Sequence, residues 1–353
     1  MRETLKERVL ALIDRLADGS RDDDARDALL RDLGEYQREH VAPYAKLRKA
    51  RGDSPALPTD VFRYARIAVH PESEDRRVFL TSGTTSGARG RHAFRDLSLY
   101  DRAAEAAARY ALFPDLASER MRLCILAPHP DEAPESSLSY MLGRFEDWVG
   151  SETRWAWREG RLELDVLVEA LNAAIRAGEP IAVLGTSFAF VHAEDALGEV
   201  RFALPAGSRL MQTGGYKGRS REVEPDALRA ALAARYGLDD ACIVAEYGMT
   251  ELSSQMYETP LRAAALGSPI PPRRLWVPGW VRATVVDPLT LSPLAEGEAG
   301  VLRIDDPANL DSVSAIQTSD LAIAHGGEIE LLGRAPGATP RGCSFAVEEA
   351  LRS

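Results

Sequence analysis

Apolar residues recur at helical spacing at the start of the chain. The pattern predicts one helix over residues 3–18 and another over residues 24–40, separated by the charged stretch 21–24. The first helix has a single apolar face, made by Leu5, Val9, Leu12, Ile13 and Leu16. Prolines then end this pattern. Residues 1–60 are therefore expected to form a helical lead-in packed on a larger core.

Short apolar segments then alternate with amphipathic segments over residues 61–280, which predicts an α/β core whose helices cover a sheet. The expected strands are 123–127, 181–185, 209–212 and 243–246, and the expected helices are 98–112, 165–177 and 225–236. Residues 281–332 lose the helical period and predict a β-rich subdomain, with strands at 281–286 and 300–304. Residues 333–353 are left as a short C-terminal stub.

Composition narrows the class of protein. A chain of 353 residues that is 45% hydrophobic can bury a large core. The formal net charge of −11 argues against nucleic-acid binding, which needs a basic surface. No apolar run approaches the ~18 residues of a membrane span, and the N-terminus lacks an apolar signal segment. With only 3 cysteines, a disulfide framework is not expected, and we expect a cytoplasmic protein.

Two polar motifs interrupt this pattern, each directly after an apolar segment. Residues 81–90 are rich in hydroxyl side chains and glycines and contain one arginine. Backbone N–H groups and hydroxyls at the end of a strand match the oxygens of a polyphosphate, although such a stretch also forms simple turns. The second motif is Tyr247-Gly248-Met249-Thr250-Glu251.

Together these motifs resemble those of the adenylate-forming superfamily, which includes acyl-CoA synthetases, adenylation domains of peptide synthetases and firefly-type luciferases. The loop pattern of that superfamily is T-S-G-T-T-G-x-P-K-G, and this chain departs from it at Ser86, Ala88 and Arg89. The Y-G-x-T-E pattern is matched in full. The resemblance implies the large N-terminal-type domain of these enzymes, with stacked α/β subdomains and a small β-rich subdomain.

Further segments are similar to a narrower family, the LuxE-like acyl-protein synthetases, and this resemblance covers about residues 79 to 344. They are 136–141, 214–222, 309–313 and 341–344. In the wider superfamily a C-terminal domain carries a lysine used in adenylation. Only a short stub follows Arg334 here, so this domain is expected to be absent or supplied by a partner.

The resemblance implies MgATP-dependent chemistry and assigns a role to each motif residue. The β- and γ-phosphates are expected on Thr81, Ser82, Gly83, Thr84, Thr85 and Arg89. The adenine is expected beside Gly214, Gly215, Tyr247 and Gly248. Thr250 is expected to bind the α-phosphate, and Glu251 and Thr84 to hold Mg²⁺.

The ribose is expected on Asp320 and Arg334, by resemblance to the T-G-D segment and the G-R pair of the superfamily. Simpler structural roles stay open for these residues. Asp320 also suits a turn, Arg334 also suits an exposed surface, and Thr250 and Glu251 also suit the first turn of a helix.

Three residues are candidates for the chemistry of acyl activation and transfer. Lys217 is the only lysine after Lys49, and we expect it to assist adenylation, although its isolation is also compatible with chance. Cys343 is a candidate acyl carrier because such synthetases hold the acyl group as a thioester; it also suits simple packing. Cys124 and Cys242 are expected in buried strands, and His129 near the acid.

The predicted function is ATP-dependent activation of a fatty or aromatic carboxylic acid as acyl-AMP, with release of pyrophosphate and acyl transfer to a protein thiol. One alternative acceptor is coenzyme A or the thiol of a carrier protein. A different class of protein also stays open, namely a nucleotide-binding subunit without catalysis. A kinase or GTPase is excluded because no G-x-x-x-x-G-K-[ST] loop is present.

Overall fold

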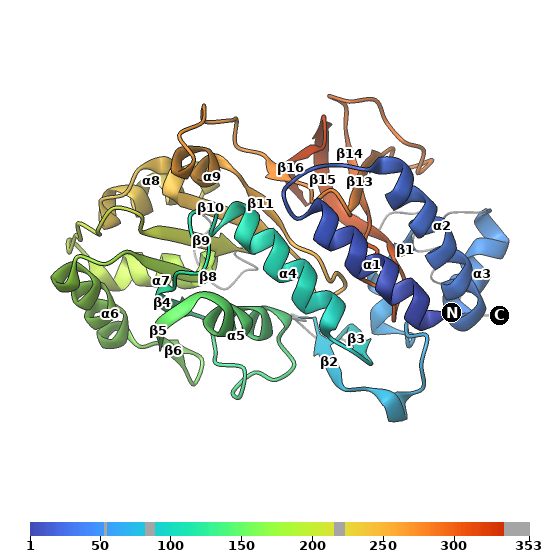
Figure 1. Cartoon of the computed structure of the whole chain (residues 1–353), viewed down its shortest axis with the longest axis horizontal. Coiled ribbons are helices and arrows are strands. Elements are labelled where there is room, and N and C mark those ends of the chain that lie inside the picture. Colours follow the sequence, from blue (N-terminus) through green and yellow to red (C-terminus); the bar gives the residue numbers. More distant parts are fainter. Residues whose placement is uncertain (53–54, 82–88, 215–222, 335–353) are drawn as a thin grey trace. The chain divides into compact units, whose positions relative to one another are not determined.

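A computed structural model of the chain describes residues 1–52, 55–81, 89–214 and 223–334 (Figure 1). Two compact units are formed from segments that are discontinuous in sequence. The first unit comprises 1–107, 249–256 and 274–353, and the second comprises 108–248 and 257–273. The division into four parts at residues 60, 280 and 332 stays a prediction.

A parallel sheet forms the centre of the second unit. Its strand order is β5 (Gly150–Trp155), β4 (Met121–Leu126), β8 (Ile181–Thr186), β9 (Arg209–Thr213) and β10 (Ile243–Tyr247). The predicted strands within this sheet are confirmed to within two residues at each end. They were recognisable because strands covered on both faces form nearly continuous apolar runs.

Helices α6 (Leu164–Ala177), α7 (Ser187–Leu197) and α8 (Pro225–Tyr236) bury apolar residues in one cluster with β4, β8, β9 and β10. Local sequence sets their ends. Pro225 occupies the first turn of α8, and α6 and α8 end at Gly178 and Gly237 in the left-handed region that glycine tolerates. The helices predicted at 165–177 and 225–236 are confirmed.

The remaining elements of the second unit are short, apart from one helix. They are α5 (Ser137–Val149), β6 (Trp157–Arg158), β7 (Arg161–Leu162), the 3-10 helix η3 (Asp240–Cys242) and α9 (Pro260–Ala265). Cys124 is buried in β4 as predicted. The strand position expected for Cys242 is wrong, because this residue ends η3 and is only partly buried.

The first unit opens with helices α1 (Arg2–Leu16), α2 (Asp23–His40) and α3 (Ala42–Arg51). The apolar face predicted for the first helix is confirmed, because the same five side chains of α1 are buried. The charged break predicted at residues 21–24 lies too far along the chain, because α1 ends at Leu16 and α2 begins at Asp23. Asp22 accepts a hydrogen bond from the Ala25 N–H and caps α2, so Asp23 and Asp24 belong to its first turn.

Antiparallel strands complete the first unit, in the order β13 (Arg282–Val286), β14 (Ala299–Asp305), β15 (Ala315–His325), β16 (Glu328–Arg334) and β12 (Leu275–Trp276). β1 (Leu57–Pro58) pairs with β15 in parallel. The β-rich character predicted for residues 281–332 is confirmed. Figure 1 shows α1 and α2 running beside these strands.

Smaller elements lead into and out of this sheet. They are η1 (Thr59–Arg63), η2 (Glu72–Glu74), and the hairpin of β2 (Arg77–Leu80) with β3 (Arg91–Phe94). Two more elements, α4 (Ser98–Ala111) and β11 (Met256–Glu258), begin in the first unit and end in the second. The helix predicted at 98–112 is confirmed as α4. Within the described ranges, no helix is both long and apolar enough to cross a membrane.

A buried arginine stabilises the second unit. Arg209, at the start of β9, is 1% exposed and forms a two-pronged ion pair with Asp115, at 2.6 and 2.7 Å. It also donates to the carbonyls of Leu112 and Gly207. These contacts satisfy a charge that would otherwise be costly to bury.

We predict that Arg209→Met lowers the free energy of unfolding by about 3 kcal/mol, because it leaves Asp115 and two carbonyls without their donor. Urea titration measures this change. The matched control is Arg176→Met, whose pair with Glu169 is exposed, and it should cost less than about 1 kcal/mol. Equal losses in the two variants would contradict the stabilising role of Arg209.

Candidate functional site

The carboxyl ends of the parallel strands in the second unit meet at one edge of the sheet. Thr186, Thr213 and Glu246 occupy neighbouring register positions at the ends of β8, β9 and β10. Gly214 follows directly after β9, and Tyr247 ends β10. In open parallel sheets, ligands bind outside this edge, so the structure brings Gly214 and Tyr247 to a position suited to binding.

Side-chain hydrogen bonds fix the backbone at this edge. The Ser187 hydroxyl lies 3.0 Å from the Gly214 carbonyl, to which it donates. Gly214 itself has a φ of 71°, which glycine adopts without strain. The Thr213 hydroxyl donates to the carboxyl group of Glu246. The starts of the segments that follow β9 and β10 are thus held by buried polar groups.

Glu246 is a functional candidate that sequence reasoning missed. Its side chain is 7% exposed, and burial raises the pKa of this carboxyl to about 7, while the hydrogen bond from Thr213 acts in the opposite direction. A single charged residue inside the apolar segment 242–247 was the available signal. A carboxyl with such a pKa changes its protonation near neutral pH.

His129 lies in the turn after β4, at the same edge of the sheet. Its ring packs edge-on against Trp155 with ring centroids 4.9 Å apart, and its Nδ1 lies 3.2 Å from the Asp131 backbone N–H, from which it accepts. The side chain is partly exposed. Its expected place near the acid substrate stays a prediction.

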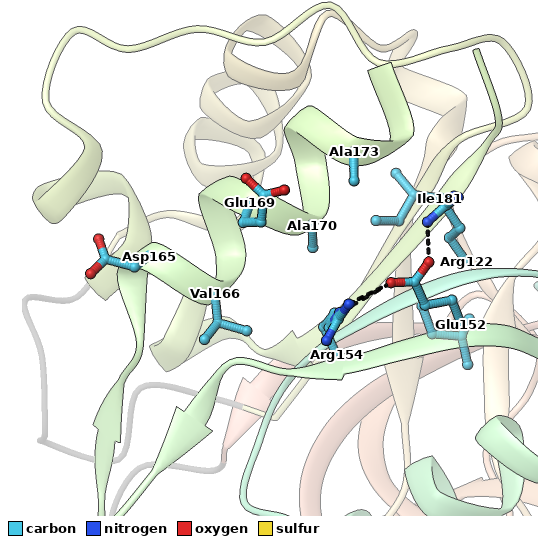
Figure 2. A pocket seen from close by; sticks show the side chains of 10 residues that line it. Arg122, Glu152, Arg154, Asp165, Val166, Glu169, Ala170, Ala173 and Ile181 are labelled. Atoms are coloured by element: carbon cyan, nitrogen blue, oxygen red, sulfur yellow. Dashed lines mark hydrogen bonds and ion pairs between the residues drawn. The ribbon is translucent and has the colours of Figure 1, made fainter. Parts of the chain in front are cut away.

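A pocket of about 310 Å³ is lined by residues of α6 and of strands β4, β5 and β8 (Figure 2). The lining includes Ile181, at the amino end of β8, and Ala170 of α6. Its arginines, Arg122 and Arg154, both pair with Glu152, as Figure 2 shows. None of the predicted site residues that the structure describes lines this pocket.

In the first unit, the hairpin of β2 and β3 frames the predicted phosphate loop. Two hydrogen bonds join Thr81 and Gly90 at the ends of the loop. The Thr81 N–H donates to the Gly90 carbonyl at 2.9 Å, and the Gly90 N–H donates to the Thr81 side-chain hydroxyl at 2.9 Å. A Cβ at position 90 would lie 2.8 Å from the Thr81 methyl group, so glycine is required there. Arg89 folds back and donates to the Thr81 carbonyl at 2.7 Å.

Residues 250–254 have little regular secondary structure, and buried side chains from distant segments hold their backbone. His92 Nδ1 lies 2.7 Å from the Thr250 carbonyl, and the Asn309 side-chain amide donates to the Glu251 carbonyl at 2.8 Å. Glu251 is itself buried. No helix begins at this point, so the alternative role of Thr250 and Glu251, in the first turn of a helix, does not apply.

Asp306 secures the following residues. Its carboxylate accepts hydrogen bonds from the backbone N–H groups of Ser253 and Ser254, at 3.0 and 2.8 Å, and from the Ser254 hydroxyl at 2.9 Å. Burial raises the pKa of Asp306, and these hydrogen bonds oppose that effect. Sequence reasoning missed this role because the partners are more than fifty residues apart.

Gln37 of α2 extends this network. Its amide donates to the Asn309 carbonyl at 2.9 Å, and its side-chain oxygen accepts from the Ser314 N–H at 3.0 Å. Residues 306–314 therefore form a buried support between α2 and residues 250–254. Residues 309–313 were noted from the sequence only as a family resemblance, without this role.

Asp320 and Arg334 face each other across β15 and β16. Arg334 Nε lies 3.5 Å from an Asp320 carboxylate oxygen, and the arginine side chain is 81% exposed. Thr318 donates to the Leu302 carbonyl at 2.7 Å, beside the bulge between β14 and β15. The structure thus brings together the two residues predicted to bind the ribose.

The predicted site residues are distributed over both units. Tyr247 and Gly248 belong to the second unit, whereas Thr250 and Glu251 belong to the first. Several predicted residues lie outside the described part of the chain: Ser82, Gly83, Thr84, Thr85, Gly215, Lys217 and Cys343. Among the described residues, no cluster of three or more metal-ligating side chains occurs. Glu251 is a hard oxygen donor of the type Mg²⁺ accepts when phosphates supply other ligands.

Solved structures with the same fold define the class. An open conformation of 2-hydroxyisobutyryl-CoA ligase in complex with 2-HIB-AMP and CoA is 14% identical, with a TM-score of 0.63, over 91% of this chain and 78% of that one. The amide bond synthetase McbA of Marinactinospora thermotolerans is 18% identical, with a TM-score of 0.50 over 77% of this chain. This chain spans 52% of McbA, about half its length. The predicted fold of adenylate-forming enzymes is confirmed.

The particular family follows from sequence comparison. The family model described as acyl-protein synthetase, LuxE, matches residues 46–352, so the chain belongs to that family. Similar curated proteins are the long-chain-fatty-acid–luciferin-component ligases of Aliivibrio fischeri and Vibrio harveyi. Both are 21% identical over 84% of this chain, and the matches cover 79% and 78% of those proteins. The predicted family and the predicted ligase class are confirmed.

The raised pKa of Glu246 predicts a pH dependence of stability. In the unfolded chain the carboxyl ionises near 4.5, and in the folded chain near 7, so the folded state holds the proton more tightly. The stabilisation that the fold gains from binding this proton more tightly is fully present below pH 4.5. It is lost as the pH rises towards 7 and beyond.

We predict that Glu246→Gln removes this pH-dependent loss of stability, because an amide side chain does not ionise in this pH range. Relative to the parent, the variant should gain on the order of 3 kcal/mol in free energy of unfolding between pH 4.5 and pH 8. Urea titrations of both proteins at several pH values measure the difference. Parallel curves for the two proteins would show that Glu246 ionises normally in the fold.

Proposed function

We propose that this enzyme activates a long-chain fatty acid with MgATP as acyl-AMP, releases pyrophosphate, and passes the acyl group to a protein thiol. The observation that carries the proposal is the fixed segment 250–254 in a chain of this family. Thr250 and Glu251 are the motif residues with a phosphate and a metal role, and their carbonyls are held by His92 and Asn309.

The expected division of labour follows from charge and position. The loop framed by Thr81 and Gly90 offers N–H groups and hydroxyls to the leaving pyrophosphate. Glu251 would hold Mg²⁺, which when bound would supply positive charge that neutralises the phosphate oxygens. Fixed donors of this kind accelerate the reaction because they need no rearrangement as charge moves.

The other predicted residues keep their proposed places. Gly214 and Tyr247 contact the adenine, and Asp320 accepts the ribose hydroxyls with Arg334 beside it. Lys217 supplies a positive charge to the meeting carboxylate and α-phosphate. The choice of a long-chain fatty acid is supported by the names of the relatives from Aliivibrio fischeri and Vibrio harveyi.

Pyrophosphate exchange into ATP, driven by a panel of fatty and aromatic acids, tests the activation step. We predict exchange with long-chain acids in the parent and a loss of at least about a hundredfold in Glu251→Gln, which removes a charge but little volume. The control is Glu194→Gln, which alters a partly buried pair with Arg235 in the second unit and should keep exchange near the parent rate. No exchange with any acid would favour the non-catalytic subunit.

Acyl transfer is tested by labelling. After incubation with a radioactive acid and MgATP, we predict that denatured protein keeps a label that neutral hydroxylamine releases, as a thioester does. Cys343→Ser should lose it, whereas Cys242→Ser should keep it, because Cys242 is partly buried in η3. A label-free parent that instead forms acyl-CoA would establish the alternative acceptor.

A further inference from the structure

His92 lies two residues after Gly90, on the strand that leaves the predicted phosphate loop. It faces Phe79 across the β2–β3 hairpin. Its side chain is 1% exposed, and its ring packs against Phe62 and Phe94 with centroid distances of 5.7 and 4.2 Å. A polar ring in such apolar surroundings needs a specific partner.

That partner is the Thr250 carbonyl, 2.7 Å from His92 Nδ1. A carbonyl oxygen can only accept, so Nδ1 carries the hydrogen. Burial lowers the pKa of His92 to about 4, which keeps the ring neutral near pH 7. The contact spans 158 residues of sequence and joins one end of the loop hairpin to the pentapeptide.

We infer that His92 is a positioning residue that sets Thr250 and Glu251 relative to the loop that closes at Thr81 and Gly90. This inference rests on the proposed function. The His92 strand continues from Gly90, whose N–H and carbonyl both bond to Thr81, so a shift of the loop base is transmitted to the Thr250 carbonyl. Asn309 holds the next carbonyl, and together the two contacts fix the peptide that orients the Thr250 hydroxyl and the Glu251 carboxylate.

Simple packing is the alternative role for this ring, and substitutions separate the two roles. In His92→Asn, the side-chain amide nitrogen takes the place of Nδ1 and can still donate to Thr250. In His92→Gln, the amide sits farther along the side chain, in the position of Nε2. His92→Phe keeps an aromatic ring between Phe62 and Phe94 but has no donor.

The experiment measures pyrophosphate exchange against Mg²⁺ concentration, together with the MgATP-induced rise in melting temperature. We predict that His92→Gln and His92→Phe lower kcat about ten- to hundredfold, raise the Mg²⁺ requirement and lose most of the thermal shift. His92→Asn should stay within about threefold of the parent. If the Gln variant does not fold, the Phe and Asn variants make the same comparison.

The chain contains a matched control. His40 Nδ1 contacts the Tyr36 carbonyl at the same 2.7 Å, near the end of α2. His40→Gln should change stability without changing the Mg²⁺ requirement or the MgATP-induced shift. The inference is overturned if Asn and Gln at position 92 are equally impaired, if all the position 92 variants match the parent, or if His40→Gln has the same effect.

Failure of the proposed function gives a different result. A parent that shows a MgATP-induced shift but no exchange with any acid would contradict the acyl-activation proposal. The thermal shifts of the Asn, Gln and Phe variants would then still decide the role of His92. A parent with neither exchange nor thermal shift would contradict both.

Discussion

The hydrogen bonds that hold residues 250–254 are the constraint on which the first unit depends. A buried segment with little regular secondary structure must find partners for its backbone groups, because each unpaired group costs free energy. Here the partners are side chains. His92 and Asn309 donate hydrogen bonds to the carbonyls of Thr250 and Glu251. The Asp306 carboxylate accepts hydrogen bonds from the backbone N–H groups that follow. Several donors converge on Asp306, and this compensates for the burial of a carboxylate. The arrangement explains why α2, β3 and the segment before β15 must fold together.

The second unit solves the same problem with regular structure. Its parallel strands satisfy one another, so side-chain hydrogen bonds are needed chiefly where the strands end. Asp306 in the first unit and Glu246 in the second are both buried carboxyl groups, but their surroundings differ. Asp306 is surrounded by donors, whereas Glu246 receives a hydrogen bond from Thr213 and has a pKa raised to about 7 by burial. Because Glu246 receives fewer hydrogen bonds than Asp306, its ionisation above neutral pH lowers the stability of the fold. Residues that lower stability in this way are typical of functional sites rather than of purely structural positions.

Much of the architecture was accessible from the sequence because it depends on local pattern. The face of α1 and four strands of the parallel sheet, β4, β8, β9 and β10, follow directly from the apolar pattern. Strand β5 was missed because its sequence is mostly polar. Helices α3, α5, α7 and α9 were missed. Ser136 caps α5 and Thr186 caps α7 through hydrogen bonds to backbone N–H groups three residues on, but a single polar residue before a helix is a weak signal. The motifs located the candidate site, whereas its supports were not predictable. The sequence around His92 does not indicate that its side chain contacts a backbone carbonyl 158 residues away. The sequence around Asn309 likewise does not indicate a contact with a carbonyl 58 residues away.

The pentapeptide itself shows why a short motif can carry so much information about the family. Its first two residues belong to the second unit and its last three to the first, so one stretch of five residues is fixed by two separate sets of contacts. Residues at the end of β10 are positioned by a parallel sheet and by the pair of Thr213 with Glu246. Residues 250–254, in the first unit, are positioned by His92 of β3 and by the 306–314 segment, which Gln37 of α2 holds in turn. Each set of contacts constrains only the residues of its own unit, so a substitution in the pentapeptide must be compatible with the contacts that hold that position. Because both parts of the pentapeptide have such contacts, a substitution in either part is expected to disturb the backbone there.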